Sequence, residues 1–321
     1  MQEYRWPAGG ITTGEIIYGC MEIGGSWDDT PPGRETRDRA FAVLDAALEA
    51  GYTMFDHADI YCRGKSETLF GEWLAARGDV RDRITIQSKC GIVLADRDAR
   101  PSPRPTVYDF SYDHITESVD GILSRLGIER VDVLLLHRPD PLVEPEEVAR
   151  AFDDLHGAGK VRSFGVSNHS AMQIDLLRSA TDYPIVANQM EISLAHPDLL
   201  LAGTAVNQRE PAWSMRAADT VEYCRLEGIT LQAWSPLGRG VYSGREENAT
   251  AKLVERLAAE YGVSREAIVL AWIMRHPAPV LPVVGSTNTD RIAAAAEASG
   301  VRLSREHWYL LAESARGMGM P

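Results

Sequence analysis

Eight short apolar runs, each followed by a segment with helical periodicity, constrain the fold of this 321-residue chain more than any other feature. The runs are continuous rather than alternating, which is typical of parallel strands that are buried on both faces. The predicted strands are Ile16–Gly19, Thr53–Asp56, Ile84–Ser88, Val131–Leu136, Arg162–Val166, Ile185–Asn188, Thr230–Ala233 and Val280–Val284.

Amphipathic helices are predicted between these runs. In the first helix, Ala40, Leu44 and Ala47 share one apolar stripe, and Gly51 follows as a C-cap. The helices of the repeat are Thr36–Ala50, Ser66–Ala76, His114–Leu126, Pro145–His156, Ser170–Ser179, Met215–Gly228, Ser264–Arg275 and Thr289–Ser299. The two extra helices are Thr250–Tyr261 and Ser304–Ala315.

This order of elements predicts a (β/α)8 TIM barrel formed by residues 1–321 as a single domain. The alternative is an open doubly wound sheet, which needs a GxGxxG turn after its first strand. Gly19–Gly24 lacks the middle glycine of that turn, and Gly238–Gly244 is too long and too late, so the barrel is favoured. The long connections 90–111 and 191–213 both follow strands, and we expect them to lie over the active-site face.

Charge and composition exclude several classes of partner. The net charge is -13, which argues against binding to nucleic acid or to an acidic membrane surface. The start of the chain does not resemble a secretory signal, and the longest apolar run, AIVLAWIM, is far shorter than a membrane span. The cysteines are scattered without a CxxC pair, which favours a reducing compartment, so we expect a cytoplasmic protein. The sequence does not indicate an oligomeric state.

Four polar residues stand at or just past the ends of three predicted strands: Asp56, Tyr61, Lys89 and His137. Each of them alone has an ordinary structural explanation, such as capping or packing. Their joint position is more informative, because catalytic groups of a (β/α)8 barrel stand at the carboxyl ends of its strands. A carboxylate, a phenol, an ammonium and an imidazole at that face predict a proton-transfer site.

The chemistry of these groups suits the reduction of a carbonyl. Hydride transfer to a carbonyl needs a proton for the developing alkoxide, and a free tyrosine, with a pKa of about 10, gives up its proton reluctantly near neutral pH. A neighbouring ammonium lowers that pKa, so Lys89 can tune Tyr61 as a general acid. Asp56 can hold Lys89 in place. His137 can donate a hydrogen bond that orients the carbonyl.

The remaining strand ends suit a nicotinamide dinucleotide. Amide and hydroxyl side chains such as those of Ser167, Asn168 and Gln189 can bind a carboxamide, and the flat ring of Trp234 can stack on a nicotinamide. The segment before the predicted helix at Thr289 offers a helix N-terminus for a phosphate. Arg291, one turn into that helix, can add a bidentate contact.

The motifs FDHADIY, QSKCGI, LLLHRPD, FGVSN, ANQ, AWSPLGRG and VVGSTNTDRI occur in this order. Over nearly its whole length the chain resembles the aldo-keto reductase superfamily, whose members are NAD(P)H-dependent carbonyl reductases on a (β/α)8 barrel. The resemblance implies that Asp56, Tyr61, Lys89 and His137 are the catalytic tetrad, with Tyr61 as the general acid. It also implies NADP(H) in preference to NAD(H), because Arg291 is suited to a 2′-phosphate.

The resemblance assigns further residues to ligands. The implied cofactor contacts are Met21, Ser167, Asn168, Gln189, Trp234, Ser235, Pro236, Leu237, Gly238, Gly240, Gly285, Ser286, Thr287, Asn288 and Arg291. The substrate contacts that we expect are Trp27, Tyr61, Cys90 and His137. No metal site is expected.

These features leave three functions open. The favoured one is an NAD(P)H-dependent oxidoreductase that reduces small aldehydes or ketones. An NADPH-binding redox sensor or regulatory subunit with little turnover is the second, although it would not require Tyr61 and Lys89 together. A metal-assisted or phosphate-binding hydrolase or isomerase is the third. His57 and His137 would be its metal ligands, but no HxH or HExxH spacing is present.

Overall fold

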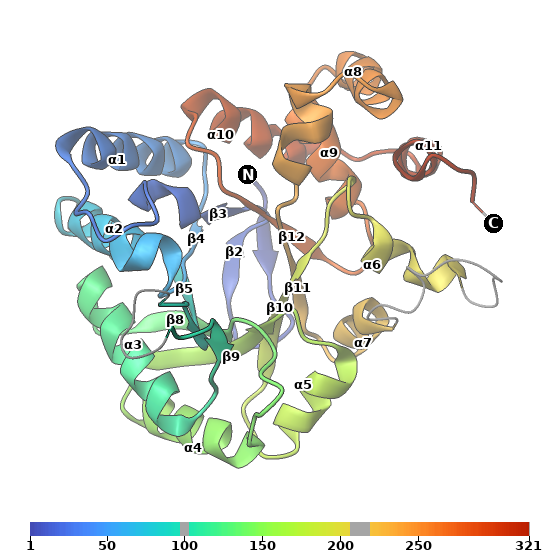
Figure 1. The fold of residues 1–321 in the computed structure, drawn as a ribbon. Helices are drawn as coiled ribbons and strands as arrows, with labels where there is room; N and C mark the ends of the chain where they lie inside the picture. Colours follow the sequence, from blue (N-terminus) through green and yellow to red (C-terminus); the bar gives the residue numbers. More distant parts are fainter. Residues whose placement is uncertain (97–102, 206–218, 321) are drawn as a thin grey trace. The chain divides into compact units, whose positions relative to one another are not determined.

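The computed structural model describes residues 1–96, 103–205 and 219–320 (Figure 1). Eight parallel strands form a closed barrel in which neighbours follow the order of the chain, and this confirms the predicted fold class. The barrel strands are β3 (Ile17–Gly19), β4 (Met54–Asp56), β5 (Thr85–Cys90), β8 (Val131–Leu136), β9 (Val161–Ser167), β10 (Ile185–Glu191), β11 (Thr230–Trp234) and β12 (Val280–Val284).

Helices follow the strands as predicted. The helices of the repeat are α1 (Arg34–Glu49), α2 (Lys65–Ala75), α3 (Tyr112–Leu126), α4 (Pro145–Gly157), α5 (Ala171–Arg178), α7 (Thr220–Leu226), α9 (Arg265–Met274) and α10 (Thr289–Ala296). The two extra helices are α8 (Ala249–Tyr261) and α11 (Arg305–Arg316). The predicted start of α7 at Met215 lies outside the described residues. Among the described residues, no helix is long and apolar enough to cross a membrane.

Side-chain caps explain where several of these helices begin. Ser111 accepts a hydrogen bond from the N–H of His114 at the start of α3, and Ser264 and Ser304 cap α9 and α11 in the same way. A capping hydroxyl satisfies a backbone donor that has no partner within the helix. Gly127 ends α3 in a left-handed conformation, with φ of 63°.

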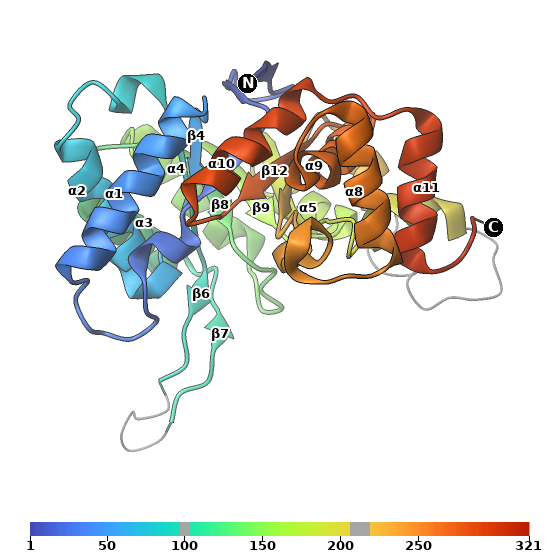
Figure 2. The same cartoon turned by 90° about the horizontal axis from the view of Figure 1, so that it is seen from above.

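Two short antiparallel hairpins were not predicted. The first pairs β1 (Glu3–Arg5) with β2 (Thr12–Gly14). The second pairs β6 (Ile92–Val93) with β7 (Val107–Tyr108) inside the predicted loop 90–111 and extends away from α2 and α3 (Figure 2). Strands of two or three residues are too short to show a hydrophobic period, so sequence periodicity cannot predict them.

The second long connection is also more ordered than a plain loop. It contains the short helix α6 (Asp198–Leu201) and the 3-10 turn η4 (Ala202–Ala205). Leu199, Leu200 and Leu201 are buried, which explains why the segment folds back onto the protein. The rest of the predicted loop 191–213, from residue 206 onward, lies outside the described residues.

The chain packs as two compact units. Unit 1 comprises Met1–Tyr18, Ala46–Tyr52 and Gln189–Pro321. Unit 2 comprises Gly19–Asp45 and Thr53–Asn188. The prediction of a single domain for residues 1–321 therefore stays a prediction.

Each unit has its own aromatic core. In unit 1 the rings of Trp272 and Trp308 stack with centroids 5.2 Å apart, and each indole N–H donates to the carbonyl of the other residue. In unit 2 the rings of Phe55, Phe70 and Trp73 meet at tilted angles with centroids 5.2–5.9 Å apart. Tilted aromatic contacts of this kind add to the stabilisation that apolar burial provides.

Candidate active site

Asp56, Tyr61, Lys89 and His137 all belong to unit 2, and the structure brings them together. Asp56 is the last residue of β4, and Lys89 is the last but one of β5. Tyr61 opens the 3-10 turn η2 (Tyr61–Gly64) that follows β4, and His137 directly follows β8. Because β4, β5 and β8 are adjacent parallel strands, their carboxyl ends meet at one face.

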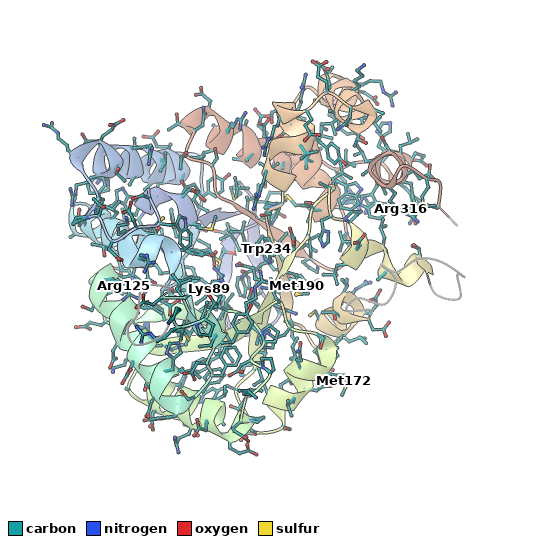
Figure 3. The ribbon with its side chains drawn as sticks, viewed as in Figure 1. Lys89, Arg125, Met172, Met190, Trp234 and Arg316 are labelled. Carbon is teal, nitrogen blue, oxygen red and sulfur yellow. The ribbon has the colours of Figure 1, made fainter. Side chains whose placement is uncertain are left out.

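Lys89, whose side chain is labelled in Figure 3, is the centre of this cluster. Its side chain is fully buried, and its Nζ donates to Asp56 Oδ2 at 2.7 Å, to the carbonyl of His57 at 2.8 Å and to the hydroxyl of Tyr61 at 3.0 Å. An ammonium has three N–H donors, so these contacts satisfy it completely. A buried charge is tolerated when it is paired and hydrogen-bonded in this way.

Gln87 is a member of the cluster that the sequence reasoning missed. Its Nε2 donates to Asp56 Oδ1 at 2.6 Å, so both oxygens of that carboxylate are bound. Gln87 precedes Lys89 by two residues on β5, which places both side chains on the same face of the strand. That spacing was the signal in the sequence that could have identified Gln87.

Burial and charge act against each other on Tyr61 and Lys89. Burial raises the pKa of the Tyr61 phenol, and this effect outweighs the opposing influence of the Lys89 ammonium. For Lys89, burial lowers the pKa. The Asp56 carboxylate and the Tyr61 oxygen together raise it by more than burial lowers it, so the net pKa is raised. Lys89 thus lowers the Tyr61 pKa as predicted, but the effect of burial, which the prediction did not include, is larger. The phenol is protonated and the lysine is charged at neutral pH.

His137 is neutral in the same surroundings. Burial, together with the nearby Lys89 and Arg138 cations, holds its pKa well below the usual range. Its ring meets the ring of Tyr61 edge to face, with centroids 5.9 Å apart. Its Nδ1 is buried and has no hydrogen-bond partner among the described residues. A neutral imidazole carries one N–H, so His137 can act as a donor to an uncharged ligand.

Asn168 and Ser167, at the end of β9, adjoin His137. The Nδ2 of Asn168 donates to the carbonyl of His137 at 3.3 Å and to the hydroxyl of Ser167 at 2.8 Å. Asn168 has a φ of 62°, a left-handed conformation that asparagine adopts more readily than most residues. These two predicted cofactor residues therefore lie beside the tetrad in unit 2.

The predicted substrate contacts Trp27 and Cys90 differ in their exposure to solvent. Trp27 is 43% exposed, and its carbonyl accepts a hydrogen bond from Arg63 Nε at 3.0 Å. Cys90 is fully buried, and burial raises the pKa of its thiol well above the usual range. It lies on the opposite face of β5 from Lys89, next to the carboxyl groups of Asp59 and Glu67. This position gives the predicted substrate contact of Cys90 no support.

The predicted cofactor residues of unit 1 include a run of left-handed backbone. Gly238, Arg239 and Gly240 have φ of 54°, 56° and 84°, and Ser235 shortly before them has φ of 51°. A Cβ at Gly238 would lie 2.8 Å from Ala195 Cβ, so only glycine fits there. The N–H groups of Gly238 and Gly240 donate to the carbonyls of Ser235 and Leu237, both at 2.9 Å, so this segment is a tight, hydrogen-bonded turn. Arg239 was not among the predicted contacts.

The other residues predicted to bind cofactor in unit 1 lie at strand ends. Gln189 is buried on β10, and its Nε2 donates to Gln232 Oε1 at 2.8 Å. Trp234, the last residue of β11, is partly exposed. The segment before α10 contains exposed Gly285 and Thr287 and partly exposed Ser286, whose carbonyl accepts from the Tyr18 hydroxyl at 2.9 Å. In the adjoining segments, Pro236 is buried and Leu237 is partly exposed.

The start of α10 carries both an amide cap and a cation. Asn288 Oδ1 accepts a hydrogen bond from the N–H of Arg291 at 3.1 Å. The exposed guanidinium of Arg291 has one ionic neighbour, Glu266, at 3.8 Å between Nε and Oε1. In unit 2, Met21 is exposed in the 3-10 turn η1 (Met21–Gly24). The helix N-terminus and the Arg291 cation suit the start of α10 for contact with an anionic ligand.

The two histidines suggested as metal ligands do not form a metal centre. The ring of His57 is fully buried edge-on against Phe70, with centroids 4.4 Å apart, and burial lowers its pKa to about 3. His57 also follows Asp56 directly, so the two side chains leave the strand on opposite sides. Among the described residues, no group of three or more His, Cys, Asp or Glu side chains is placed to hold a metal ion.

A closed barrel with a buried acid–base cluster at its strand ends defines this protein as a (β/α)8 barrel enzyme. The family profile described as Aldo/keto reductase family matches residues 15–316. The chain therefore belongs to the aldo/keto reductase family, as its motifs predicted. Membership in this family supports carbonyl reduction with a nicotinamide cofactor.

Individual relatives agree with this assignment, and solved structures agree with the fold. The chain is 36% identical to a 6-dehydroglucose reductase of Agrobacterium fabrum, over 92% of each chain. It is 37% identical to the oxidoreductase YdhF of Escherichia coli, over 87% of this chain and 88% of YdhF. An aldo-keto reductase of Klebsiella pneumoniae in complex with NADPH has the same fold, with a TM-score of 0.73, 22% identity and coverage of 100% and 97% of the two chains.

Proposed function

We propose that this protein is an NADPH-dependent reductase of aldehydes or ketones in which Tyr61 is the general acid. One observation carries the proposal: a single fully buried ammonium, that of Lys89, binds both the Asp56 carboxylate and the Tyr61 hydroxyl. A lysine placed only for stability would not need a phenol as its third acceptor. The family membership supports the same reaction class.

The state of Tyr61 suits proton donation. Its phenol is protonated at neutral pH, because the ordinary pKa of tyrosine is about 10 and burial raises it further. When the proton moves from the phenol to the developing alkoxide, the phenolate that remains lies 3.0 Å from the Lys89 ammonium. The ammonium stabilises that charge at the moment it forms, which is the electrostatic help that a general acid needs.

His137 and Asp56 have supporting roles in this proposal. The neutral imidazole of His137 donates one N–H to the carbonyl oxygen and so aligns it with the Tyr61 hydroxyl. Asp56 keeps Lys89 charged and fixed within the apolar interior. When it is bound, a reduced nicotinamide supplies the hydride, and the tetrad supplies the proton.

The residues at the other strand ends fit a dinucleotide. In unit 2, Ser167 and Asn168 would hold the carboxamide, and Met21 would contact the nicotinamide end. In unit 1, Gln189 would contact the carboxamide and Trp234 would stack on the nicotinamide ring. The turn at residues 238–240 would lie along the pyrophosphate, with Arg239 as an additional cation. The remaining contacts of the proposal are Ser235, Pro236, Leu237, Gly285, Ser286, Thr287, Asn288 and Arg291.

The preference for NADPH over NADH depends on the start of α10. A helix N-terminus attracts an anion, and an exposed arginine one turn further on can bind a phosphate through two parallel hydrogen bonds. Asn288 and Arg291 provide this combination. The Klebsiella pneumoniae relative that was solved with NADPH supports the same preference.

A cofactor-consumption screen tests the proposal. The panel contains aldehydes, ketones, dicarbonyls and oxidised sugars, the last because two relatives are 6-dehydroglucose reductases. Each compound is assayed with NADPH and with NADH by the loss of absorbance of the reduced nicotinamide. We expect turnover of at least one class with NADPH. Tight NADPH binding without turnover across the panel would instead support the redox-sensing or regulatory function.

A further inference from the structure

The turn η2, which carries Tyr61, packs closely against the turn η1. A Cβ added to Gly24 would lie 2.6 Å from Cys62 Cβ and 2.8 Å from the backbone nitrogen of Ser66. Real Cβ atoms do not approach other atoms so closely, so the two turns meet at this distance only because residue 24 is glycine. The position of η1 is therefore tied to the position of the Tyr61 turn.

Hydrogen bonds reinforce this packing. The carbonyl of Met21 accepts from the Cys62 thiol at 3.2 Å and from the Ser66 hydroxyl at 3.0 Å. The same thiol also reaches the carbonyl of Gly25 at 3.2 Å. The residues directly after Tyr61 therefore bind both ends of η1, from which the segment Ser26–Thr30 continues.

The backbone after Tyr61 is held in an unfavourable conformation. Cys62 and Arg63 are consecutive left-handed residues, with φ of 48° and 57°. This conformation is unfavourable for a residue that carries a side chain. Contacts of both side chains offset this strain. Cys62 binds η1, and Arg63 donates from Nε to the carbonyl of Trp27 at 3.0 Å.

Lys65 organises the segment around Trp27. Its Nζ donates to Ser26 Oγ at 3.1 Å, to Asp28 Oδ1 at 3.3 Å and to the carbonyl of Thr30 at 3.0 Å. Asp28 Oδ1 also accepts from Ser26 Oγ and from the N–H of Thr30, both at 2.9 Å. Only 11% of the Lys65 side chain is exposed, although the aspartate that it binds is 59% exposed. Lys65 is therefore well ordered for a lysine near the surface.

The ring of Trp27 is presented by this anchored backbone. Its carbonyl is bound by Arg63, and its flanking residues are bound by Lys65, while residue Trp27 is 43% exposed. A large apolar ring on a fixed segment, close to the Tyr61 turn, is suited to contact a ligand.

We propose that Lys65 and Arg63 are positioning residues that fix Trp27 as a specificity-determining contact for the apolar part of carbonyl substrates. This inference rests on the proposed function, because it assigns a substrate contact beside the proposed general acid. Trp27 touches the substrate, and Lys65 and Arg63 act through it. The class of substrate is a carbonyl compound with a bulky apolar or aromatic substituent.

Substrate selectivity in single and double variants tests the inference. Reduction of a small aliphatic aldehyde is compared with reduction of an aromatic aldehyde, both with NADPH. In Lys65→Met we expect kcat/KM for the aromatic aldehyde to fall about tenfold, mainly through KM, with a change of about twofold or less for the small one. Lys65→Arg should retain most of the selectivity. Lys160→Met is the matched control, because it breaks another lysine–aspartate pair in unit 2.

A double variant separates positioning from general destabilisation. Trp27→Ala should lose the same selectivity as Lys65→Met, and the combination of the two should lose no more than Trp27→Ala alone. Additive losses, or equal losses for both aldehydes, would overturn the inference. If the wild-type enzyme reduces no carbonyl, the proposed function fails and the substrate role of Trp27 fails with it.

Hydrogen exchange tests the anchoring without turnover. The amide of Thr30 is bonded to Asp28, which Lys65 holds in place. We expect this amide to exchange faster in Lys65→Met than in the wild type and to stay protected in Trp27→Ala. Unchanged exchange in Lys65→Met would show that Lys65 does not order the segment, and it would overturn the positioning role even in an active reductase.

Discussion

The Nζ of Lys89 donates a hydrogen bond of 3.0 Å to the hydroxyl of Tyr61. This contact joins the end of β5 to the turn after β4, 28 residues earlier in the sequence, and it links a charged group to a neutral acid. The contact matters most after proton transfer, when Tyr61 has become a phenolate, rather than in the resting state. The phenol is protonated at rest, and the ammonium favours the phenolate that forms when the proton leaves.

Tyr61→Phe should abolish reduction while NADPH affinity stays nearly intact. The substitution removes the proton donor and one acceptor of Lys89 but keeps the ring that packs edge to face with His137. We expect kcat to fall by at least about 100-fold, in line with the loss of a general acid. NADPH binding is measured by fluorescence titration, independently of turnover.

Tyr112→Phe is the matched control for that experiment. It also removes a tyrosine hydroxyl of unit 2, in this case one that binds Asp154 at 2.7 Å near the surface. The control should keep full activity. Normal activity in Tyr61→Phe would contradict the mechanism.

Lys89→Met should destabilise the protein more than the double variant Asp56→Asn/Lys89→Met does. The single substitution leaves the buried Asp56 carboxylate without its cation, which costs about 3–5 kcal/mol. The double variant removes both charges and keeps the Gln87 side chain as a donor to residue 56. Urea unfolding gives the free energies of unfolding. If the double variant loses as much stability as Lys89→Met and Asp56→Asn lose together, the pair is not coupled. Lys89→Met and the double variant should both be inactive.

Arg291→Ala should weaken the binding of NADPH far more than that of NADH. A hydrogen bond to a charged phosphate is worth about 1.5–3 kcal/mol, so we expect roughly a ten- to hundredfold rise in Kd for NADPH. Arg265→Ala is the control in unit 1, because its guanidinium pairs with Glu255 instead. Equal weakening of both cofactors by Arg291→Ala would mean that this arginine does not bind the 2′-phosphate.

Asp59→Asn should stabilise the protein increasingly as the pH rises from about 4 to about 7. Burial, and then the nearby Glu67 carboxylate, raise the pKa of Asp59 to about 7, against the opposing effect of Arg125. The folded state therefore keeps this carboxyl protonated in a range where the unfolded chain releases the proton. Its contribution to stability is present at low pH and is lost as the pH rises through about 7.

Thermal unfolding of wild type and Asp59→Asn across pH 4 to 8 measures this difference. The gap in Tm should be small near pH 4 and should reach its full size near pH 8, since asparagine stays neutral throughout. Asp120→Asn on α3 is the control, and its gap should vary much less because that side chain is 59% exposed. A gap between wild type and Asp59→Asn that does not grow with pH would mean that Asp59 is ionised in the folded protein.

Strand periodicity and strand ends could be predicted because they depend on local pattern. The run Val131–Leu136 is buried in β8 and is apolar except for Asp132, and His137, the polar residue that follows it, lies beside Tyr61. The hairpin of β6 and β7 could not be predicted. Its strands are too short to carry a pattern, and its base is set by remote contacts, among them the bond from the N–H of Phe110 to Asp140 at 3.0 Å.

The sequence by itself determined the barrel, the family and the four residues at three strand ends, because residue type and chain order carry that information. Only the tertiary structure decided the balance of charge within the site. Burial raises the pKa of Tyr61 despite the neighbouring ammonium of Lys89, and Cys90 faces the carboxyl groups of Asp59 and Glu67 instead of Lys89. These properties depend on which atoms surround a group and how much water reaches it, and both are fixed by contacts between residues distant in the chain.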